Sequence, residues 1–181
     1  MKAVEVFWRQ GYKATTVQDL VDHLGIGRSS LYATFGGKRA LFLRALRHYD
    51  QVFREEAVAE IARSSKSPRQ TIKRIFRMAS AAILEDGSRD GCLLINTALE
   101  LSPHDCASEE IVRSAFTGME GFFRTMIERG QASGEISRDL SATDTARALL
   151  GLFIGLRVLA RSRPEAPLLR SIEKQADDLL K

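Results

Sequence analysis

The apolar residues of this chain recur with the spacing of helices rather than strands. Between residues 17 and 24 they fall at i, i+3, i+4 and i+7, which places them on one face of a short helix. The same kind of spacing returns in the segments 72–83, 112–126 and 169–179. No stretch shows sustained alternation of apolar and polar residues with β-branched enrichment. The pattern predicts an all-α protein of about nine helices.

Glycine and hydroxyl residues divide the first helices. We expect Gly11 to close the first helix. Thr15 or Thr16 can act as the N-cap of the second helix. Gln18 or Asp19, three residues further on, can complete a capping box by accepting a hydrogen bond from the backbone of the cap residue.

The second helix is followed by a tight bend. It ends near Leu24, and Gly25 can adopt the positive φ that a sharp exit requires. Ile26 supplies an apolar side chain to fill the bend, and another short helix can start near Gly27 or Arg28. Two short helices joined by a three-residue turn of this kind predict a helix-turn-helix motif.

The helix after this bend has an outer face suited to a nucleic-acid groove. Leu31 and Phe35 are expected to point inward. The remaining side chains then point outward: Arg28, Ser29, Ser30, Tyr32, Ala33 and Thr34. Arg28 can reach guanine edges or phosphate, and the small side chains allow a close approach to the major groove.

The location of the net charge supports this interpretation slightly. The chain has a net charge of +4, and residues 1–50 contain eight basic and four acidic side chains, so the whole excess lies in this segment. Local positive charge attracts polyanions and raises their encounter rate. An excess of this size is also small enough to arise by chance.

In these residues the sequence resembles the TetR/AcrR family of bacterial transcriptional regulators. The resemblance covers roughly residues 1–50. It is carried by Phe7, Gly11-Tyr12, Ala14-Thr15-Thr16, Gly25-Ile26-Gly27, Ser30-Leu31-Tyr32, Phe35, Lys38 and Ala40-Leu41-Phe42. The rest of the chain matches only in helix number and in short stretches such as Gly91-Cys92-Leu93-Leu94. The resemblance implies a ligand-responsive repressor that binds a palindromic operator as a homodimer and is released by a small-molecule inducer.

The resemblance also implies which residues touch DNA. Thr16, Tyr32 and Lys38 would contact phosphates, and Gly27 would lie near the DNA backbone. Arg28, Ser29, Ala33 and Thr34 would lie against bases, and Ser30 is assigned to the DNA-binding residues without a separate role. Members of the family often carry a basic arm before a longer first helix. Only ten residues precede Gly11 here, so either the sequence is truncated or the arm contacts are absent, and we assign no arm contacts.

The chain is expected to divide into two functional parts. Residues 1–44 would form the helix-turn-helix DNA-binding domain, and residues 45–181 a helical domain for ligand binding and dimerisation. A helix from Lys38 to about Arg63 would belong to both. A ligand that favours one shape of the bundle would swing this helix and change the spacing of the two recognition helices, which must stay near one duplex turn, about 34–36 Å.

The segment 146–160 is apolar on nearly every face, so it must be buried on two sides. One partner is its copy in a second chain, packed with the final helix into a four-helix interface. Gly151 and Gly155 would permit a close approach. The residues assigned to dimerisation are Leu149, Leu152, Leu156, Leu159, Ile172, Ala176 and Leu179. An ordinary central core helix is the alternative.

The helix expected over 108–133 carries methionine and aromatic side chains, which can line an adaptable apolar cavity or simply fill a core. The resemblance implies an inducer cavity in this bundle. The residues assigned to it are Met78, Leu94, Phe116, Met119, Phe123, Met126, Phe153 and Arg157. Arg157 can anchor an acidic ligand or pair with a carboxylate, since buried charges are usually paired.

Cysteine chemistry offers an alternative function. Cys92 follows Gly91 at an expected helix start, where the helix dipole favours a thiolate, so it is a possible redox or electrophile sensor. A small buried apolar residue is the other interpretation. Cys92, His104 and Cys106 match no compact zinc spacing, so we expect no metal. The alternative to the repressor is a small-molecule or cysteine-based electrophile- or redox-sensing module with secondary DNA contact.

Several other classes of protein are not expected. No nucleophile triad, paired-carboxylate motif or phosphate loop is visible, so we expect no enzyme and no cofactor. No apolar run reaches the roughly 18 residues that span a bilayer. The first ten residues lack a signal-peptide profile. The expected location is the cytoplasm. The expected partners are double-stranded operator DNA, a second copy of the chain and an unknown small-molecule inducer, with no membrane.

Overall fold

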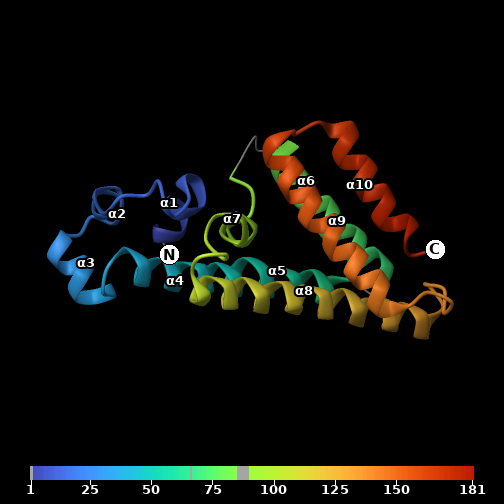
Figure 1. Ribbon diagram of the computed structural model, residues 1–181. Helices are drawn as coiled ribbons and strands as arrows, with labels where there is room; N and C mark the ends of the chain where they lie inside the picture. The colour runs from blue at the N-terminus through green and yellow to red at the C-terminus, as the bar shows by residue number, and fades with distance from the viewer. Residues whose placement is uncertain (1, 66, 85–89) are drawn as a thin grey trace. The chain divides into compact units, whose positions relative to one another are not determined.

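The computed structural model describes residues 2–65, 67–84 and 90–181, and these residues form helices and connecting turns with no strand (Figure 1). The helices are α1 (Lys2–Gln10), α2 (Val17–Leu24), α3 (Arg28–Phe35), α4 (Lys38–Tyr49), α5 (Ala57–Ser64), α6 (Pro68–Leu84), α7 (Leu93–Glu100), α8 (Cys106–Ser133), α9 (Ala142–Ser162) and α10 (Ala166–Asp178). A π-helical segment, η1 (Asp50–Glu56), joins α4 and α5 into one continuous run. Counted this way, the described residues hold nine helices, and the all-α prediction is confirmed. In this part of the chain, none of the helices has the length and apolarity that a bilayer crossing requires.

Contacts group the chain into two units. The first comprises Met1–Glu55 and Cys92–Ser114, and the second comprises Glu56–Gly91 and Ala115–Lys181. By its contacts, α7 and the start of α8 therefore belong with the N-terminal helices. The division into functional domains at residues 44 and 45 stays a prediction.

Capping residues fix the ends of the short helices in the first unit. Thr16 Oγ1 accepts a hydrogen bond from the Asp19 amide at 3.1 Å, and Asp19 Oδ2 accepts one from the Thr16 amide at 2.7 Å. The capping box predicted for α2 is thus confirmed for this pair. Gly11 follows α1 with φ 79, which confirms that it ends this helix.

The first unit has a core of aromatic and leucine side chains. Phe7 of α1 and Phe42 of α4 form a T-shaped ring pair, with centroids 5.0 Å apart. Leu20 of α2 and Leu31 of α3 are fully buried. Burying one leucine contributes about 1.5–3 kcal/mol. Because α2 and α3 have only eight residues each, this packing stabilises them more than their helix propensity does.

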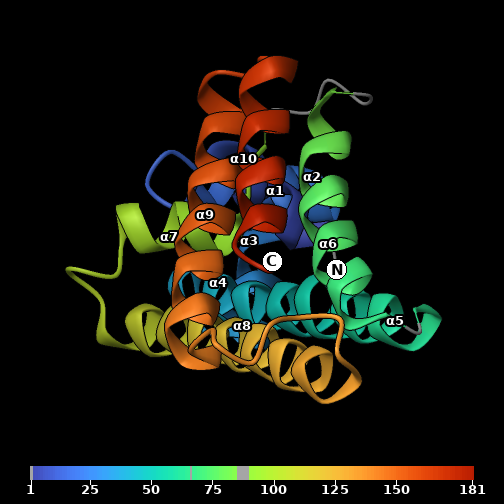
Figure 2. The ribbon, with the colours of Figure 1, turned by 90° about the vertical axis from the view of Figure 1, so that its right-hand side faces the viewer.

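In the second unit, α6, α9 and α10 pack against one another (Figure 2). Phe76 of α6, Phe123 of α8 and Phe153 of α9 form a ring cluster with centroids 5.7 to 6.3 Å apart. These rings lie within a continuous apolar core that extends to α5 and α10. The offset and edge-on ring arrangements are the favourable ones for aromatic pairs.

A polar contact adds to this packing at one end of α10. Asp177 accepts hydrogen bonds from Arg69 Nε at 2.8 Å and from Lys73 Nζ at 2.9 Å, both on α6. Burial alone would raise the pKa of Asp177, but the two cations outweigh it, so the pKa lies below its ordinary value. The carboxylate is therefore charged and holds α10 to α6.

Candidate nucleic-acid interface

The bend between α2 and α3 has the geometry that the sequence predicted. Gly25 has φ 68 and donates its amide to the Val21 carbonyl at 3.0 Å, and the Ile26 amide donates to the same carbonyl at 3.3 Å. Gly27 is extended and directly precedes α3, which begins at Arg28. Three residues therefore connect two helices, as in a helix-turn-helix motif.

Helix α3 has one anchored face and one free face. Leu31 is fully buried, and Phe35 is half-buried with the Arg44 guanidinium 5.2 Å from its ring centroid. The exposed side chains are Arg28, Ser29, Ser30, Tyr32, Ala33 and Thr34. The free face therefore offers a cation, three hydroxyls and a phenol ring on a fixed helix. These groups can donate hydrogen bonds to phosphates and to base edges.

Lys38 begins α4 next to a constrained glycine. A Cβ added at Gly37 would lie 3.3 Å from Tyr32 Cε1, so the Tyr32 ring packs closely on the backbone there. The Lys38 ammonium lies 4.4 Å from the centroid of the Tyr12 ring, within the range of a cation–π contact. This contact limits the positions that the half-buried lysine can adopt.

Thr16 is exposed but already engaged. Its hydroxyl and its amide both donate to Asp19 Oδ2 at 2.7 Å. The backbone hydrogen bond from Thr16, and then the side-chain one, hold the pKa of Asp19 below its ordinary value. A phosphate at this helix end would have to compete with that carboxylate.

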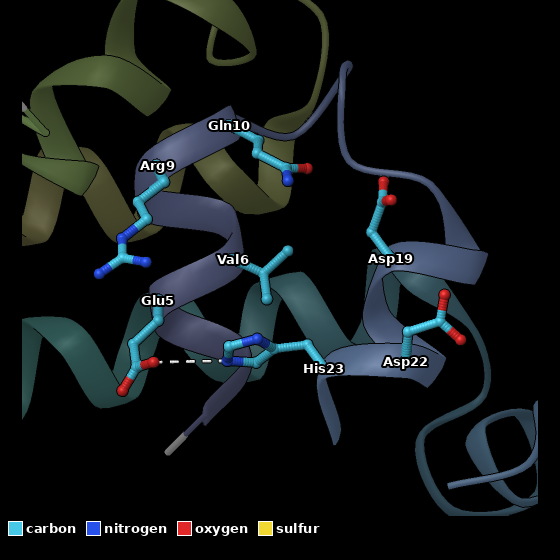
Figure 3. Close-up of a pocket in the computed structure, with 7 residues that line it drawn as sticks. All are labelled: Glu5, Val6, Arg9, Gln10, Asp19, Asp22 and His23. Carbon is cyan, nitrogen blue, oxygen red and sulfur yellow. Dashed lines mark ion pairs between the residues drawn. The ribbon is translucent and has the colours of Figure 1, made fainter. Parts of the chain in front are cut away.

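A cleft of about 400 Å³ lies between α1 and α2 (Figure 3). It is lined by Glu5, Val6, Arg9, Gln10, Asp19, Asp22 and His23. Figure 3 shows Glu5 and His23 pointing toward one another, and Glu5 Oε2 lies 3.3 Å from His23 Nε2. The three carboxylates of the cleft repel phosphate, so we leave it outside the candidate DNA surface.

Sequence reasoning missed two contacts near Lys38. Glu100 of α7 accepts hydrogen bonds from the backbone amides of Tyr12 and Lys13. Arg39 of α4 donates to Asp105, which directly precedes α8. The partners are 66 to 88 positions apart in the sequence, so no local pattern could have indicated them.

Most residues assigned to the inducer cavity lie in the second unit. Met119, Phe123 and Met126 are buried, and Phe116 and Phe153 are half-buried. The rings of Phe123 and Phe153 take part in the ring cluster. This packing leaves both interpretations of the segment, cavity lining and plain core, in place.

The other three assigned residues have different surroundings. Met78 of α6 is 47% exposed. Leu94 is buried, but it belongs to the first unit by its contacts. Arg157 of α9 is half-buried and donates to the carbonyl oxygens of Ala79, at 3.4 Å, and Gly91.

The residues assigned to dimerisation fall into two groups. Those buried within one protomer are Leu149, Leu156 and Ala176, and those that are half-buried are Leu152, Leu159, Ile172 and Leu179. Val158 is an exposed apolar side chain on α9. A Cβ added at Gly151 or Gly155 would meet nothing within 4 Å, so both open onto space in the single chain.

The two cysteines are free thiols. Cys92 is half-buried and Cys106 is exposed. Across the described residues, no group of three or more histidine, cysteine and carboxylate side chains could hold a metal ion. The sensing role of Cys92 stays a prediction.

Two family matches account for most of the chain. Residues 2–45 match the bacterial regulatory proteins of the tetR family, and residues 68–173 match the tetracyclin repressor-like C-terminal domain. The chain belongs to the tetR family of bacterial regulators. The family resemblance and the helix-turn-helix assignment are thereby confirmed. This protein is a transcriptional regulator and not an enzyme.

Relatives resemble the regulator over nearly its whole length. The HTH-type transcriptional regulator YezE of Bacillus subtilis is 34% identical over 161 residues, which cover 88% of this chain and 82% of YezE. The HTH-type transcriptional repressor ComR of Escherichia coli is 29% identical over 160 residues, or 88% of this chain and 76% of ComR. A solved structure of a cysteine mutant of the TetR family regulator CifR with a 26-base-pair operator DNA has a TM-score of 0.86 at 26% identity, covering 99% of this chain and 93% of CifR.

Proposed function

We propose that this regulator is a repressor that binds a palindromic operator as a homodimer and is released by a small-molecule inducer. The observation that carries the proposal is the free face of α3, which is held outward by the buried Leu31. CifR, a related regulator, is bound to operator DNA in its solved structure. Helix α3 is the element that enters the major groove.

Each exposed residue of this surface has a role in the proposal. Arg28 reads base edges in the major groove. Ser29, Ser30, Ala33 and Thr34 lie on the same face, and Gly27 lies near the DNA backbone. Tyr32 and Lys38 contact phosphates. A phosphate contact by Thr16 requires its hydroxyl to leave Asp19.

The proposed dimer forms through α9 and α10. The half-buried residues Leu152, Leu159, Ile172 and Leu179, with Val158, would meet a second copy. Gly151 and Gly155 leave room for a close approach. Leu149, Leu156 and Ala176 support this face from within the protomer. Two copies are needed because each half of a palindrome takes one recognition helix.

The proposed inducer is apolar and binds in the second unit among the methionine and aromatic side chains of α8 and Phe153. Arg157 would bind an acidic group of the inducer by exchanging a carbonyl partner for it. The assignment of Met78 and Leu94 to the inducer cavity stays a prediction. The continuous run of α4, η1 and α5 would carry the change to the first unit. Because the proposed partner is operator DNA, the proposal includes a cytoplasmic location.

A salt titration tests the proposal. The full chain would be measured on the palindromic duplex that it selects from a random pool and on a scrambled duplex of equal length. The proposal predicts at least about 10³-fold tighter binding to the palindrome and a steep loss of affinity with salt. Lys38→Ala should lower the affinity for both duplexes by the same factor. Equal, weak affinity for both duplexes would contradict the proposal and favour the sensing module.

A further inference from the structure

Helix α7 contacts the turn between α1 and α2 through Glu100. Its Oε2 accepts a hydrogen bond from the Tyr12 amide at 3.1 Å, and its Oε1 accepts one from the Lys13 amide at 2.7 Å. These consecutive amides follow Gly11, whose φ is 79. Successive amides after a left-handed residue form a concave anion site, and a carboxylate of the same chain fills this one. Residues 11–13 are called the α1–α2 turn below.

Gly11 leaves the space that this carboxylate needs. A Cβ at this position would lie 2.9 Å from Glu100 Oε2, which is too close without a shift of one of the two groups. The α1–α2 turn and Glu100 therefore match each other in shape as well as in charge.

Tyr12 connects the α1–α2 turn to α4 through its ring contacts. Its ring centroid lies 4.9 Å from that of Phe42 and 6.4 Å from that of Phe7. The Lys38 ammonium lies 4.4 Å from the same ring. Since Glu100 holds the Tyr12 backbone and neighbouring rings hold its side chain, the ammonium rests on a fixed surface.

The residue next to Lys38 is held by the same stretch of chain. Arg39 Nε donates to Asp105 Oδ2 at 2.6 Å, and Asp105 Oδ1 accepts from the Ser108 amide at 2.8 Å. Residues 100–105 therefore contact both the α1–α2 turn and the first turn of α4. The family match over the DNA-binding helices covers residues 2–45, and both carboxylates lie in the separate match to the C-terminal domain, residues 68–173.

We propose that Glu100 is a positioning residue for DNA binding, which fixes the α1–α2 turn and thereby holds Tyr12 under the Lys38 ammonium. The inference rests on the operator phosphate contact proposed for Lys38. Simple charge predicts the opposite effect, because removing a carboxylate makes the protein more positive and favours DNA. A loss of affinity on removing Glu100 therefore cannot come from the change in net charge.

The test compares full-length variants on the palindromic duplex that the wild-type chain selects from a random pool, over a range of salt concentrations. Glu100→Ala should weaken binding roughly tenfold and flatten the slope of log K against log salt by about 0.9, as expected for the loss of one phosphate contact. In a Lys38→Ala background the same change should have no further effect. Glu109→Ala is the matched control, since this carboxylate pairs with Arg113 within α8. It should leave the affinity within about twofold of wild type.

Glu100→Gln is the second variant, because it keeps the side-chain volume and an acceptor for one amide. Its affinity should fall between those of wild type and Glu100→Ala.

If Glu100→Ala binds like Glu109→Ala while Lys38→Ala binds weakly, the inference is wrong and the proposed function stands. The inference is also wrong if Glu100→Ala lowers the affinity equally in the wild-type and Lys38→Ala backgrounds. Glu100 would then support the N-terminal helices in general and not Lys38. No loss for Lys38→Ala overturns the proposed phosphate contact and the inference together.

Discussion

At the scale of single residues, Gly11 and Gly25 share a left-handed backbone and differ in what surrounds them. A Cβ at Gly25 meets nothing within 4 Å, whereas one at Gly11 would lie 2.9 Å from Glu100 Oε2. Gly25→Ala should therefore cost only backbone strain, about 1–2 kcal/mol of the free energy of unfolding. Gly11→Ala should cost about 1–2 kcal/mol more, because the Glu100 carboxylate must move and lose hydrogen bonds.

Denaturant titration of the two variants measures this difference. Gly121→Ala is the control, because Gly121 lies within α8 with open space around it. That change should stabilise the protein by about 0.5–1 kcal/mol through helix propensity. Equal losses for Gly11→Ala and Gly25→Ala would contradict the close contact with Glu100.

Local roles could be predicted from the sequence where backbone chemistry alone decides them. Gly25 adopts the positive φ expected of it. The choice of cap required the structure: Thr15 is buried and donates to the Gly11 carbonyl at 2.6 Å, which leaves Thr16 as the cap and Asp19 as its partner. The sequence did not indicate the contact of Glu100 with the α1–α2 turn, since its partners lie 87 and 88 positions away.

At the scale of elements, the Arg39–Asp105 pair joins the start of α4 to the start of α8. The hydrogen bond from Arg39, followed by that from the Ser108 amide, lowers the pKa of Asp105 from 3.8 to about 2. Because the folded-state pKa lies below the unfolded value, the pair stabilises the fold fully above about pH 4, and this contribution is lost as the pH falls toward about 2. The effect is modest, since the Arg39 side chain is 57% exposed.

Asp105→Asn should therefore flatten the fall in stability between about pH 4 and about pH 2. The measurement is the free energy of unfolding from denaturant titrations at a series of pH values. Arg39→Ala should flatten the same window, because it removes the main cause of the lowered pKa. An unchanged pH dependence in both variants would show that the pair does not contribute.

Helix periodicity predicted where helices lie better than which face each one buries. Helix α9 is apolar on nearly every side, so the pattern could not separate its core face from its outward face. The structure buries Leu149 and Leu156 and exposes Gly151 and Val158. The π-helical segment between α4 and α5 is likewise invisible to periodicity, because it changes the hydrogen bonding and not the apolar composition.

At the scale of the whole molecule, the proposed dimer predicts that a charge on the outward face of α9 will disrupt both dimerisation and DNA binding. Val158 is 36% exposed in the single chain and would be buried against a second copy. Val158→Asp places a charge in that interface, so it should give a monomer and a large loss of affinity for the palindrome. Sedimentation measures the mass, and Thr117→Asp, at an exposed site on α8, is the control. A dimeric Val158→Asp protein with full affinity would exclude this face as the interface.

The central claim is that α3 presents Arg28 to the base edges of duplex DNA. The most direct measurement selects the preferred duplex for Arg28→Ala and for Lys38→Ala from the same random pool. Arg28→Ala should lose discrimination at one symmetric pair of positions, by about 1–3 kcal/mol per base. Lys38→Ala should select the wild-type sequence with weaker affinity. If Arg28→Ala selected the wild-type sequence with undiminished preference at every position, the claim would be contradicted.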